Sequence, residues 1–382
     1  MQRLVTFITV VTAATTVSHV LGSLVVCTDT EQQNHPALCY MLQRAEDDLD
    51  DFVRIAQEHA SQHGLLVGDN WVDKYYIAAD VAIESQRVRR RLDGQLPVVF
   101  AHGMGDSCFN SGMQHITSHA SELLGGVYAT CIPTGKTQAE DTKNGYFLNM
   151  DASVEVFATA IENDPKLHGG FHAIGFSQGN NVIRGYIAKH NHPPVHTFIS
   201  INGVNAGDGA VPYCRPSVTT GKEGNSVDFD MCDFLMEQAG KQAYTEFAQQ
   251  HSFQANYWRD PRPTAFEKYQ KYSQLAKWNN EAGFVNQTLV ENWAKTQGFV
   301  WVMASDDGMV WPKEGEQWGA PDPDDPFHHI LAMEETEWYK KDLFGLRTAQ
   351  ENSKNYFETF EGDHLQFSME DFDRWVTTYL NN

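Results

Sequence analysis

A serine between two glycines, in the segment Gly175-Phe176-Ser177-Gln178-Gly179, constrains the fold of this chain more than any other feature. The apolar run that precedes it is typical of a buried strand, and residues 180–189 that follow have helical character. A serine at such a junction is typical of the nucleophile elbow, a sharp, strained turn that presents the hydroxyl at the edge of a sheet. Glycines flank it because the turn leaves no room for a Cβ. Ser177 is therefore the predicted nucleophile.

The chain from residue 97 onward alternates between strand-like and helix-like segments. Strands are predicted at 97–101, 126–132, 171–174, 195–201, 299–303 and 356–360, and helices at 113–124, 152–162, 180–189 and 369–380. This alternation predicts an α/β fold with a mostly parallel sheet flanked by helices. Residues 206–296 interrupt it with a largely helical stretch rich in aromatic residues, which we interpret as an insertion that caps the sheet.

An acid and a histidine follow the serine in the order that an α/β-hydrolase requires. Asp307 lies in the turn after the predicted strand at 299–303, and His364 lies between the last strand and the last helix. In such a site the imidazole takes the proton of the serine, and the carboxylate fixes the orientation of the imidazole. Asp306 is adjacent to Asp307, so it is the alternative acid; an Asp-Gly pair is also a common turn.

Two backbone amides are predicted to bind the oxyanion that forms during acyl transfer. Gln178, the residue after the nucleophile, supplies one N–H, and Met104 in the glycine-rich loop 102–106 supplies the other. This loop lacks the lysine and the serine or threonine of a phosphate-binding P-loop. The histidines are scattered along the chain, and neither a metal nor a cofactor is predicted.

The N-terminus is typical of a secretory signal peptide over residues 1–23. Arg3 precedes an apolar segment at 4–17, and small residues follow at Gly22 and Ser23. A signal anchor is the alternative, but the segment is short for a bilayer span. We expect no transmembrane anchor after signal removal. The formal net charge of −22 argues against a nucleic-acid partner.

Residues 24–94 differ from the rest of the chain. They contain a helix-like run at 37–63 with one apolar stripe and an acidic block, and a basic cluster at 87–91. Two interpretations stay open for this cluster. It is either a solvated linker or a processing site for a basic-specific protease, in which case 24–91 is a pro-segment.

Six cysteines in a secreted chain favour disulfide bonds. Proximity in sequence favours the pairs Cys27–Cys39 and Cys214–Cys232. The two remaining cysteines, Cys108 and Cys131, either pair or stay as buried thiols. Asn286 begins the sequon Asn-Gln-Thr, which predicts an N-glycosylated surface position.

Several motifs, in order along the chain, resemble the palmitoyl-protein thioesterase family. They lie at residues 99–108, 135–137, 164–167, 175–179, 232–234, 257–261 and 361–366. The resemblance extends from about residue 97 to the C-terminus. It implies a lysosomal-type serine hydrolase with an α/β-hydrolase domain at 95–382, which removes long-chain fatty acyl groups from cysteine thiols. The family nucleophile, acid and histidine fall on Ser177, Asp307 and His364, the oxyanion donors on Met104 and Gln178, and a family disulfide on Cys214–Cys232.

The chain departs from the family pattern at two places. Phe109 stands where similar sequences have a second cysteine beside the first, so a disulfide between neighbouring residues cannot form at Cys108. No cysteine occurs in 158–192, so a further family disulfide is missing. Residues 24–94 have no counterpart in the family.

The resemblance implies S-acylated proteins or peptides, and acyl-CoA, as substrates. Preference for a long acyl chain needs an apolar channel, since each buried methylene contributes about 0.8 kcal/mol. The aromatic insertion either lines this channel or forms ordinary core. An esterase or lipase acting on oxygen esters and a non-catalytic binding protein are the alternative functions. Lysosome, vacuole or extracellular space is the expected location.

Overall fold

The computed structural model describes residues 95–214, 236 and 238–381. The predicted signal peptide (1–23) and the extension (24–94), with Cys27, Cys39 and the basic cluster at 87–91, lie outside the described residues. So does Cys232. No helix in the described part of the chain is long and apolar enough to span a bilayer.

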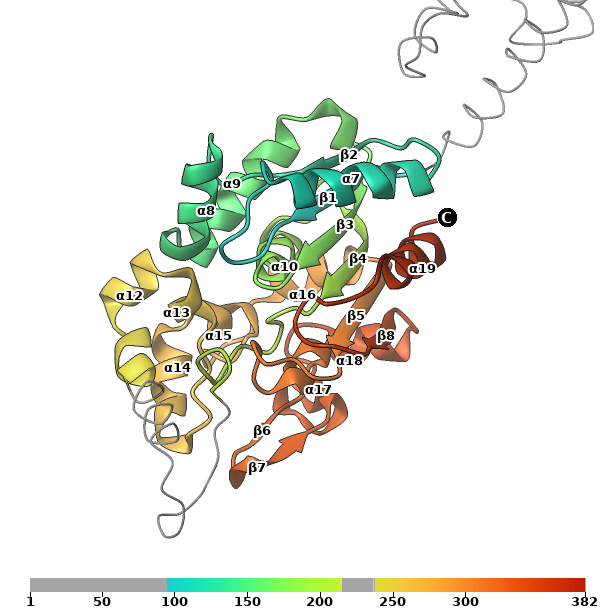
Figure 1. Ribbon diagram of the computed structural model, residues 1–382. Helices are drawn as coiled ribbons and strands as arrows, with labels where there is room; N and C mark the ends of the chain where they lie inside the picture. The colour runs from blue at the N-terminus through green and yellow to red at the C-terminus, as the bar shows by residue number, and fades with distance from the viewer. Residues whose placement is uncertain (1–94, 215–235, 237, 382) are drawn as a thin grey trace, which may run out of the picture. The chain divides into compact units, whose positions relative to one another are not determined.

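Six parallel strands form the central sheet, in the order β2-β1-β3-β4-β5-β8 (Figure 1). They are β1 (Val98–Ala101), β2 (Ala129–Cys131), β3 (Phe171–Phe176), β4 (Val195–Ile201), β5 (Gly298–Ala304) and β8 (Asn355–Phe360). The inner strands are buried along almost their whole length, which is why they appear in the sequence as continuous apolar runs rather than as alternating ones.

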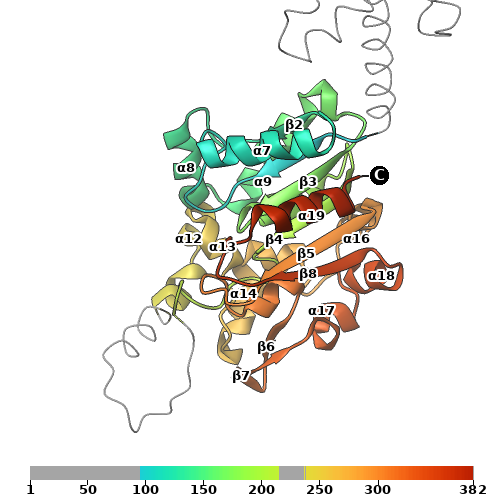
Figure 2. The ribbon, with the colours of Figure 1, turned by 45° about the vertical axis from the view of Figure 1, so that its right-hand side comes forward.

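Helices cover both faces of the sheet, as Figure 2 shows. One face carries α9 (Met150–Glu162), α10 (Gly179–Lys189) and α16 (Gln287–Lys295), with α9 and α16 packed against α10. The other face carries α7 (Ser111–Leu123) and α19 (Met369–Tyr379), which pack against each other. This arrangement confirms the predicted α/β-hydrolase fold with a parallel sheet.

The predicted strands and helices of the alternating region are present, with ends that shift by up to a few residues. Helix α8 (Gln138–Phe147) and the antiparallel pair β6 (Ala320–Asp322) and β7 (Asp325–Leu331) are among the elements that the sequence did not predict. Helix α8 is mostly polar and buries only Asp141 and Gly145, so its sequence carries no apolar stripe. The pair β6 and β7 contains prolines and aspartates, which are rare in strands.

Short helices fill the aromatic-rich region between β4 and β5. They are α12 (Glu246–His251), α13 (Phe253–Tyr257), η2 (Pro263–Ala265), α14 (Phe266–Tyr272) and α15 (Gln274–Trp278), gathered beside α8 and α9 in Figure 1. Many aromatic side chains of this region are part of the hydrophobic core, namely Tyr244, Phe253, Tyr257, Trp258, Tyr269 and Trp278. These six rings therefore act mainly as core, and of the six only Phe253 also lines a small cavity, beside Gln178.

Three more 3-10 helices and two short α-helices connect the elements around the sheet. They are η1 (Pro165–Leu167), η3 (Lys313–Gln317), η4 (Met333–Glu335), α17 (Glu337–Lys340) and α18 (Leu346–Glu351). Of these, η3 packs against β5 and follows the turn that contains Asp307.

A disulfide bond joins Cys108, in the loop after β1, to Cys131 at the end of β2, with the two Cα atoms 5.5 Å apart. This settles the alternative that the sequence left open for these two cysteines. Cys214 is also disulfide-bonded, and its partner lies outside the described residues.

Candidate functional site

The turn between β3 and α10 has the geometry expected of a nucleophile elbow. Ser177 has φ +52°, a left-handed conformation that is costly for a residue with a Cβ. Its backbone N–H donates to the carbonyl of Ile201 at 3.0 Å, which fixes the turn to the end of β4. A Cβ on Gly179 would lie 2.5 Å from the carbonyl oxygen of His102, so only glycine fits where the helix begins.

Ser177, His364 and Asp307 form one hydrogen-bonded chain. The Oγ of Ser177 lies 2.8 Å from Nε2 of His364, and Nδ1 of His364 lies 2.6 Å from Oδ2 of Asp307. The three residues follow β3, β8 and β5, whose carboxyl ends meet at one edge of the parallel sheet. The structure thus brings together the three side chains that the sequence singled out, although 187 positions separate Ser177 from His364.

The two neighbouring aspartates have different surroundings. Asp307 is buried, and its Oδ1 accepts from the amides of Met309 and Val310, both at 2.8 Å. Burial alone would raise the pKa of Asp307, but hydrogen bonds, the largest from His364, outweigh burial and hold that pKa below its usual value. Asp306 is exposed, and within the described ranges its side chain accepts a hydrogen bond from the hydroxyl of Ser305 alone. Asp307, not Asp306, therefore contacts the imidazole.

The loop after β1 lies against the serine. A Cβ on Gly103 would be 3.3 Å from the Cβ of Ser177, so glycine allows the close approach of this loop. The neighbouring amide of Met104 and the amide of Gln178 have no acceptor among the residues that the structure describes. The side chain of Gln178 is buried and donates to the carbonyl of Gly145 at 2.7 Å.

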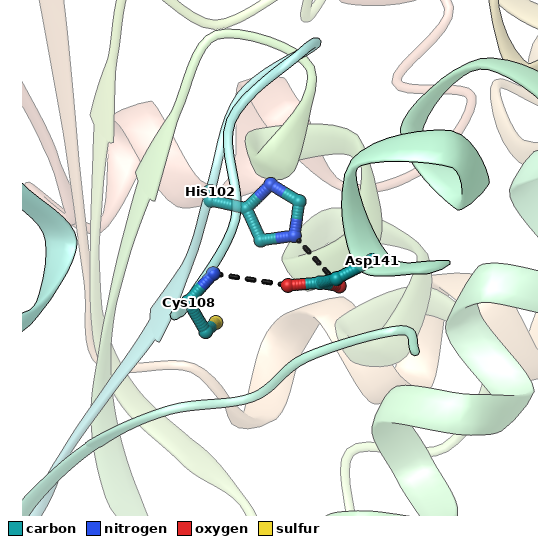
Figure 3. A group of neighbouring side chains, drawn as sticks. All are labelled: His102, Cys108 and Asp141. Carbon is teal, nitrogen blue, oxygen red and sulfur yellow. Dashed lines mark hydrogen bonds and ion pairs between the residues drawn. The ribbon is translucent and has the colours of Figure 1, made fainter. Parts of the chain in front are cut away.

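Asp141 anchors this loop from helix α8 (Figure 3). Its Oδ2 accepts from the hydroxyl of Ser107 at 2.9 Å and from the amide of Cys108 at 3.0 Å. Its Oδ1 accepts from the amide of Thr134 at 2.6 Å. One buried carboxylate therefore joins the loop after β1 to the loop after β2, and the disulfide at Cys108 joins the same two segments covalently.

His102 completes this network. Its Nε2 lies 3.1 Å from Oδ1 of Asp141, and its Nδ1 lies 2.9 Å from the carbonyl of Gly103. Burial opposes a charge on the ring, but the hydrogen bond and the charge of Asp141 outweigh burial and raise the pKa of His102. For Asp141, burial likewise opposes the charge, and its partners, His102 first, lower the pKa to about 2. The pair therefore favours an imidazolium hydrogen-bonded to a carboxylate.

Three polar residues near the reacting groups were missed by the sequence reasoning: Asp141, Asn202 and Glu316. Asn202 directly follows the buried strand β4, and this position at the carboxyl end of a parallel strand was a usable signal. Asp141 and Glu316 lie in polar segments that do not follow a predicted strand, so nothing in the sequence distinguished them.

Two groups of side chains have the composition of a metal site: His102, Cys108 and Asp141, and Asp307, Glu316 and His364. The sulfur of Cys108 is bonded to Cys131. In the second group, His364 is hydrogen-bonded to Asp307 on one side and to Ser177 on the other. In each group, at least one potential ligand is therefore engaged in another bond.

Asn286, the predicted glycosylation position, is exposed at the start of α16. Its side chain accepts from the amide of Thr288 at 3.1 Å and caps the helix.

Comparison with known proteins agrees with the resemblance. The family model described as palmitoyl protein thioesterase matches residues 97–364. Palmitoyl-protein thioesterase 1 of Caenorhabditis elegans is 34% identical over 279 residues, which cover 72% of this chain and 89% of that protein. Palmitoyl-protein thioesterase 3 of Dictyostelium discoideum is 29% identical over 292 residues, 75% of this chain and 92% of that protein. Lysosomal thioesterase PPT2 of Mus musculus is 26% identical over 255 residues, 66% of this chain and 76% of that protein.

The family model spans well over half of the chain, and the nematode relative is similar over most of both sequences. Together with the hydrolase fold, they show that the chain is a thioester hydrolase that belongs to the palmitoyl protein thioesterase family.

Proposed function

We propose that this protein removes palmitoyl and similar long acyl groups from the cysteines of S-acylated proteins or peptides, and from acyl-CoA, with Ser177, His364 and Asp307 as its catalytic triad. The observation that carries the proposal is the chain of hydrogen bonds from the strained serine through the imidazole to the buried carboxylate. Family membership supplies the thioester as the bond that is cleaved.

In the proposed acylation step, Nε2 of His364 takes the proton from the hydroxyl of Ser177, whose oxygen attacks the thioester carbonyl. The amides of Met104 and Gln178 donate to the oxyanion that forms. When the tetrahedral intermediate collapses, the C–S bond breaks and the imidazolium returns its proton to the leaving thiolate. Water then attacks the acyl-serine through the same base, which releases the fatty acid and restores the hydroxyl.

The leaving group favours thioesters over oxygen esters. A thiol is far more acidic than an alcohol, so the departing sulfur needs little help from the imidazolium. The acyl chain is expected to bind apolar surface near the loop after β1, where Ile132, Val182 and Phe253 line a small cavity next to Gln178. Burial of eight additional methylenes contributes roughly 6 kcal/mol, enough to favour a 16-carbon over an 8-carbon chain.

The location and domain assignments are part of the same proposal. We propose entry into the secretory pathway, with residence in a lysosome or vacuole or outside the cell, because a signal-like N-terminus accompanies similarity to a protein named lysosomal thioesterase. We further propose a hydrolase domain at 95–382 with a helical cap at about 206–296, and a glycan on Asn286, whose exposure is compatible with one.

Replacing the nucleophile is the direct test of this proposal. Ser177→Ala should reduce hydrolysis of a palmitoyl thioester to the level of the buffer and leave the unfolding temperature nearly unchanged, because the elbow accepts a smaller side chain. The wild type should hydrolyse the thioester faster than the matched palmitoyl oxygen ester, and a fluorophosphonate should label wild type only. Equal or greater activity on the oxygen ester would favour an esterase, and labelling of Ser177→Ala at another serine would refute the assignment.

The two aspartates should differ sharply when each is changed to asparagine. Asp307→Asn should lower kcat by roughly 10⁴-fold, because an amide cannot orient the correct imidazole tautomer. Asp306→Asn, a matched change at the exposed neighbour, should lower kcat by less than about threefold, since an exposed polar group contributes little. Steady-state kinetics with the palmitoyl thioester shows which of the two aspartates is the acid of the triad. A larger loss of kcat in Asp306→Asn than in Asp307→Asn would make Asp306 the acid.

Asp141→Asn should affect both catalysis and the pH dependence of stability. We expect a lower kcat with a nearly unchanged KM, because the loop that carries Met104 loses its anchor. The folded-state pKa of Asp141 is about 2, below its usual value of 3.8. Its ionised carboxylate therefore stabilises the folded protein above pH 3.8, and this stabilisation is lost as the pH falls toward 2. Protonated His102 also stabilises the folded protein, because its pKa is raised on folding. This stabilisation is lost as the pH rises through the folded-state pKa of His102.

Urea unfolding of wild type and Asp141→Asn should therefore differ most between about pH 4 and 6.5, by about 2 kcal/mol, with a smaller difference at pH 2. Glu140→Gln, on the exposed side of the same helix, is the control and should behave as wild type. An Asp141→Asn protein with wild-type kcat and wild-type stability at pH 5 would contradict this role.

A further inference from the structure

A second buried carboxyl group lies beside Asp307, and the proposed reaction assigns it no role. Glu316 is on the 3-10 helix η3 and is completely shielded from solvent. A carboxyl oxygen of Glu316, one of Asp307 and a ring nitrogen of His364 lie within 4.8 Å of one another. The acid of the proposed triad is therefore paired with another acid.

One oxygen of Glu316 connects three parts of the site. Its Oε2 accepts from Nδ2 of Asn202 at 2.9 Å and from the amide of Ala304 at 3.1 Å, at the ends of β4 and β5. Asn202 in turn accepts from the amide of Leu365 at 3.0 Å through its Oδ1. Glu316 is thus linked through one side chain to the loop that carries His364.

The other oxygen, Oε1, has no hydrogen-bond donor in the described part of the chain. Two ionised carboxylates side by side in a buried site repel each other, and one of them must hold a proton. Burial first, and the bond to Asp307 second, raise the pKa of Glu316 well above its usual value, whereas the pKa of Asp307 is lowered. The proton therefore belongs to Glu316, which can then donate it in a hydrogen bond to Asp307.

The other titratable groups near the pair are Asp208, His364 and Lys313. Asp208 lies near Asp307 from the segment after β4, and burial raises its pKa to about 7. His364 faces Asp307 from the loop after β8. Lys313, on the same 3-10 helix as Glu316, donates to the carbonyl of Ser305. Further negative charge on Glu316 would thus add to an already acidic, buried cluster.

We propose that Glu316 is a positioning residue of the thioesterase reaction: as a neutral carboxylic acid it donates a hydrogen bond to the carboxylate of Asp307 and holds it against Nδ1 of His364. This inference rests on the proposed triad. The arrangement keeps Asp307 ionised and directed at the imidazole of His364. It adds no second negative charge, which would make His364 bind its proton more tightly.

Two substitutions separate this role from a purely structural one. Glu316→Gln keeps an oxygen for Asn202 and Ala304 and offers an N–H to Asp307, so kcat/KM should stay within about threefold of wild type, with the same acidic limb in its pH profile. Glu316→Leu removes the donor, and kcat should fall roughly tenfold to a hundredfold, the range for a hydrogen bond to a charged group. KM should stay within about twofold.

The direction in which the pH profile shifts distinguishes a neutral Glu316 from an ionised one. Without the donor, the carboxylate of Asp307 stabilises the protonated imidazole more strongly, so the acidic limb of kcat/KM for Glu316→Leu should move to higher pH. An ionised Glu316 predicts the reverse, a shift to lower pH in both variants. Glu314→Gln and Glu314→Leu, on the same 3-10 helix but outside the cluster, serve as matched controls and should show no shift.

Three results would each overturn the proposal. The first is an acidic limb that moves to lower pH in Glu316→Gln, and the second is a wild-type kcat in Glu316→Leu. The third is a folded Glu316→Leu that loses activity while its acidic limb stays in place. Circular dichroism and thermal unfolding test whether the variants are folded. If Glu316→Leu is not folded, the pH profile of Glu316→Gln still shows whether Glu316 is neutral or ionised in the wild type. In all these outcomes fluorophosphonate labelling of Ser177 in the wild type persists. Its loss, or activity in Ser177→Ala, would instead refute the proposed triad itself.

Discussion

The strained turn at Ser177 is the constraint on which the rest of the site depends. A left-handed serine between β3 and α10 is surrounded closely by neighbouring backbone, which requires glycine at 179 and leaves little room for a Cβ at 103. The turn directs the hydroxyl toward the edge of the sheet where the strands end. His364 and Asp307 reach the same edge from β8 and β5, so the parallel sheet itself brings the three side chains together.

The loop after β1 has support of its own. Asp141 provides it through hydrogen bonds to both sides of the loop, and the bond between Cys108 and Cys131 ties it to β2. The departure from the family pattern at Phe109 is consistent with this: its neighbour Cys108 pairs with the adjacent strand and not with the following residue. The oxyanion donor proposed at Met104 depends on this anchoring.

The sequence predicted the parts of the site that follow local rules. A serine between glycines, an acid after a late strand and a histidine before the last helix are each short patterns with a fixed place in the topology, and the structure brings all three together. Asp141 and Glu316 have no such pattern, because their importance comes from contacts with distant loops. The pairing of Cys108 with Cys131 was likewise open until β1 and β2 were seen as neighbours.

The central claim, that Ser177 carries the acyl group during turnover, is tested most directly by trapping the intermediate. Wild-type protein mixed with a palmitoyl thioester and quenched in acid within the first turnover should gain the mass of one palmitoyl group, located on the peptide that contains Ser177. The modification should disappear as the substrate is consumed. Rapid release of palmitate with no acylated protein at any time, or an acyl group on another residue, would contradict the account.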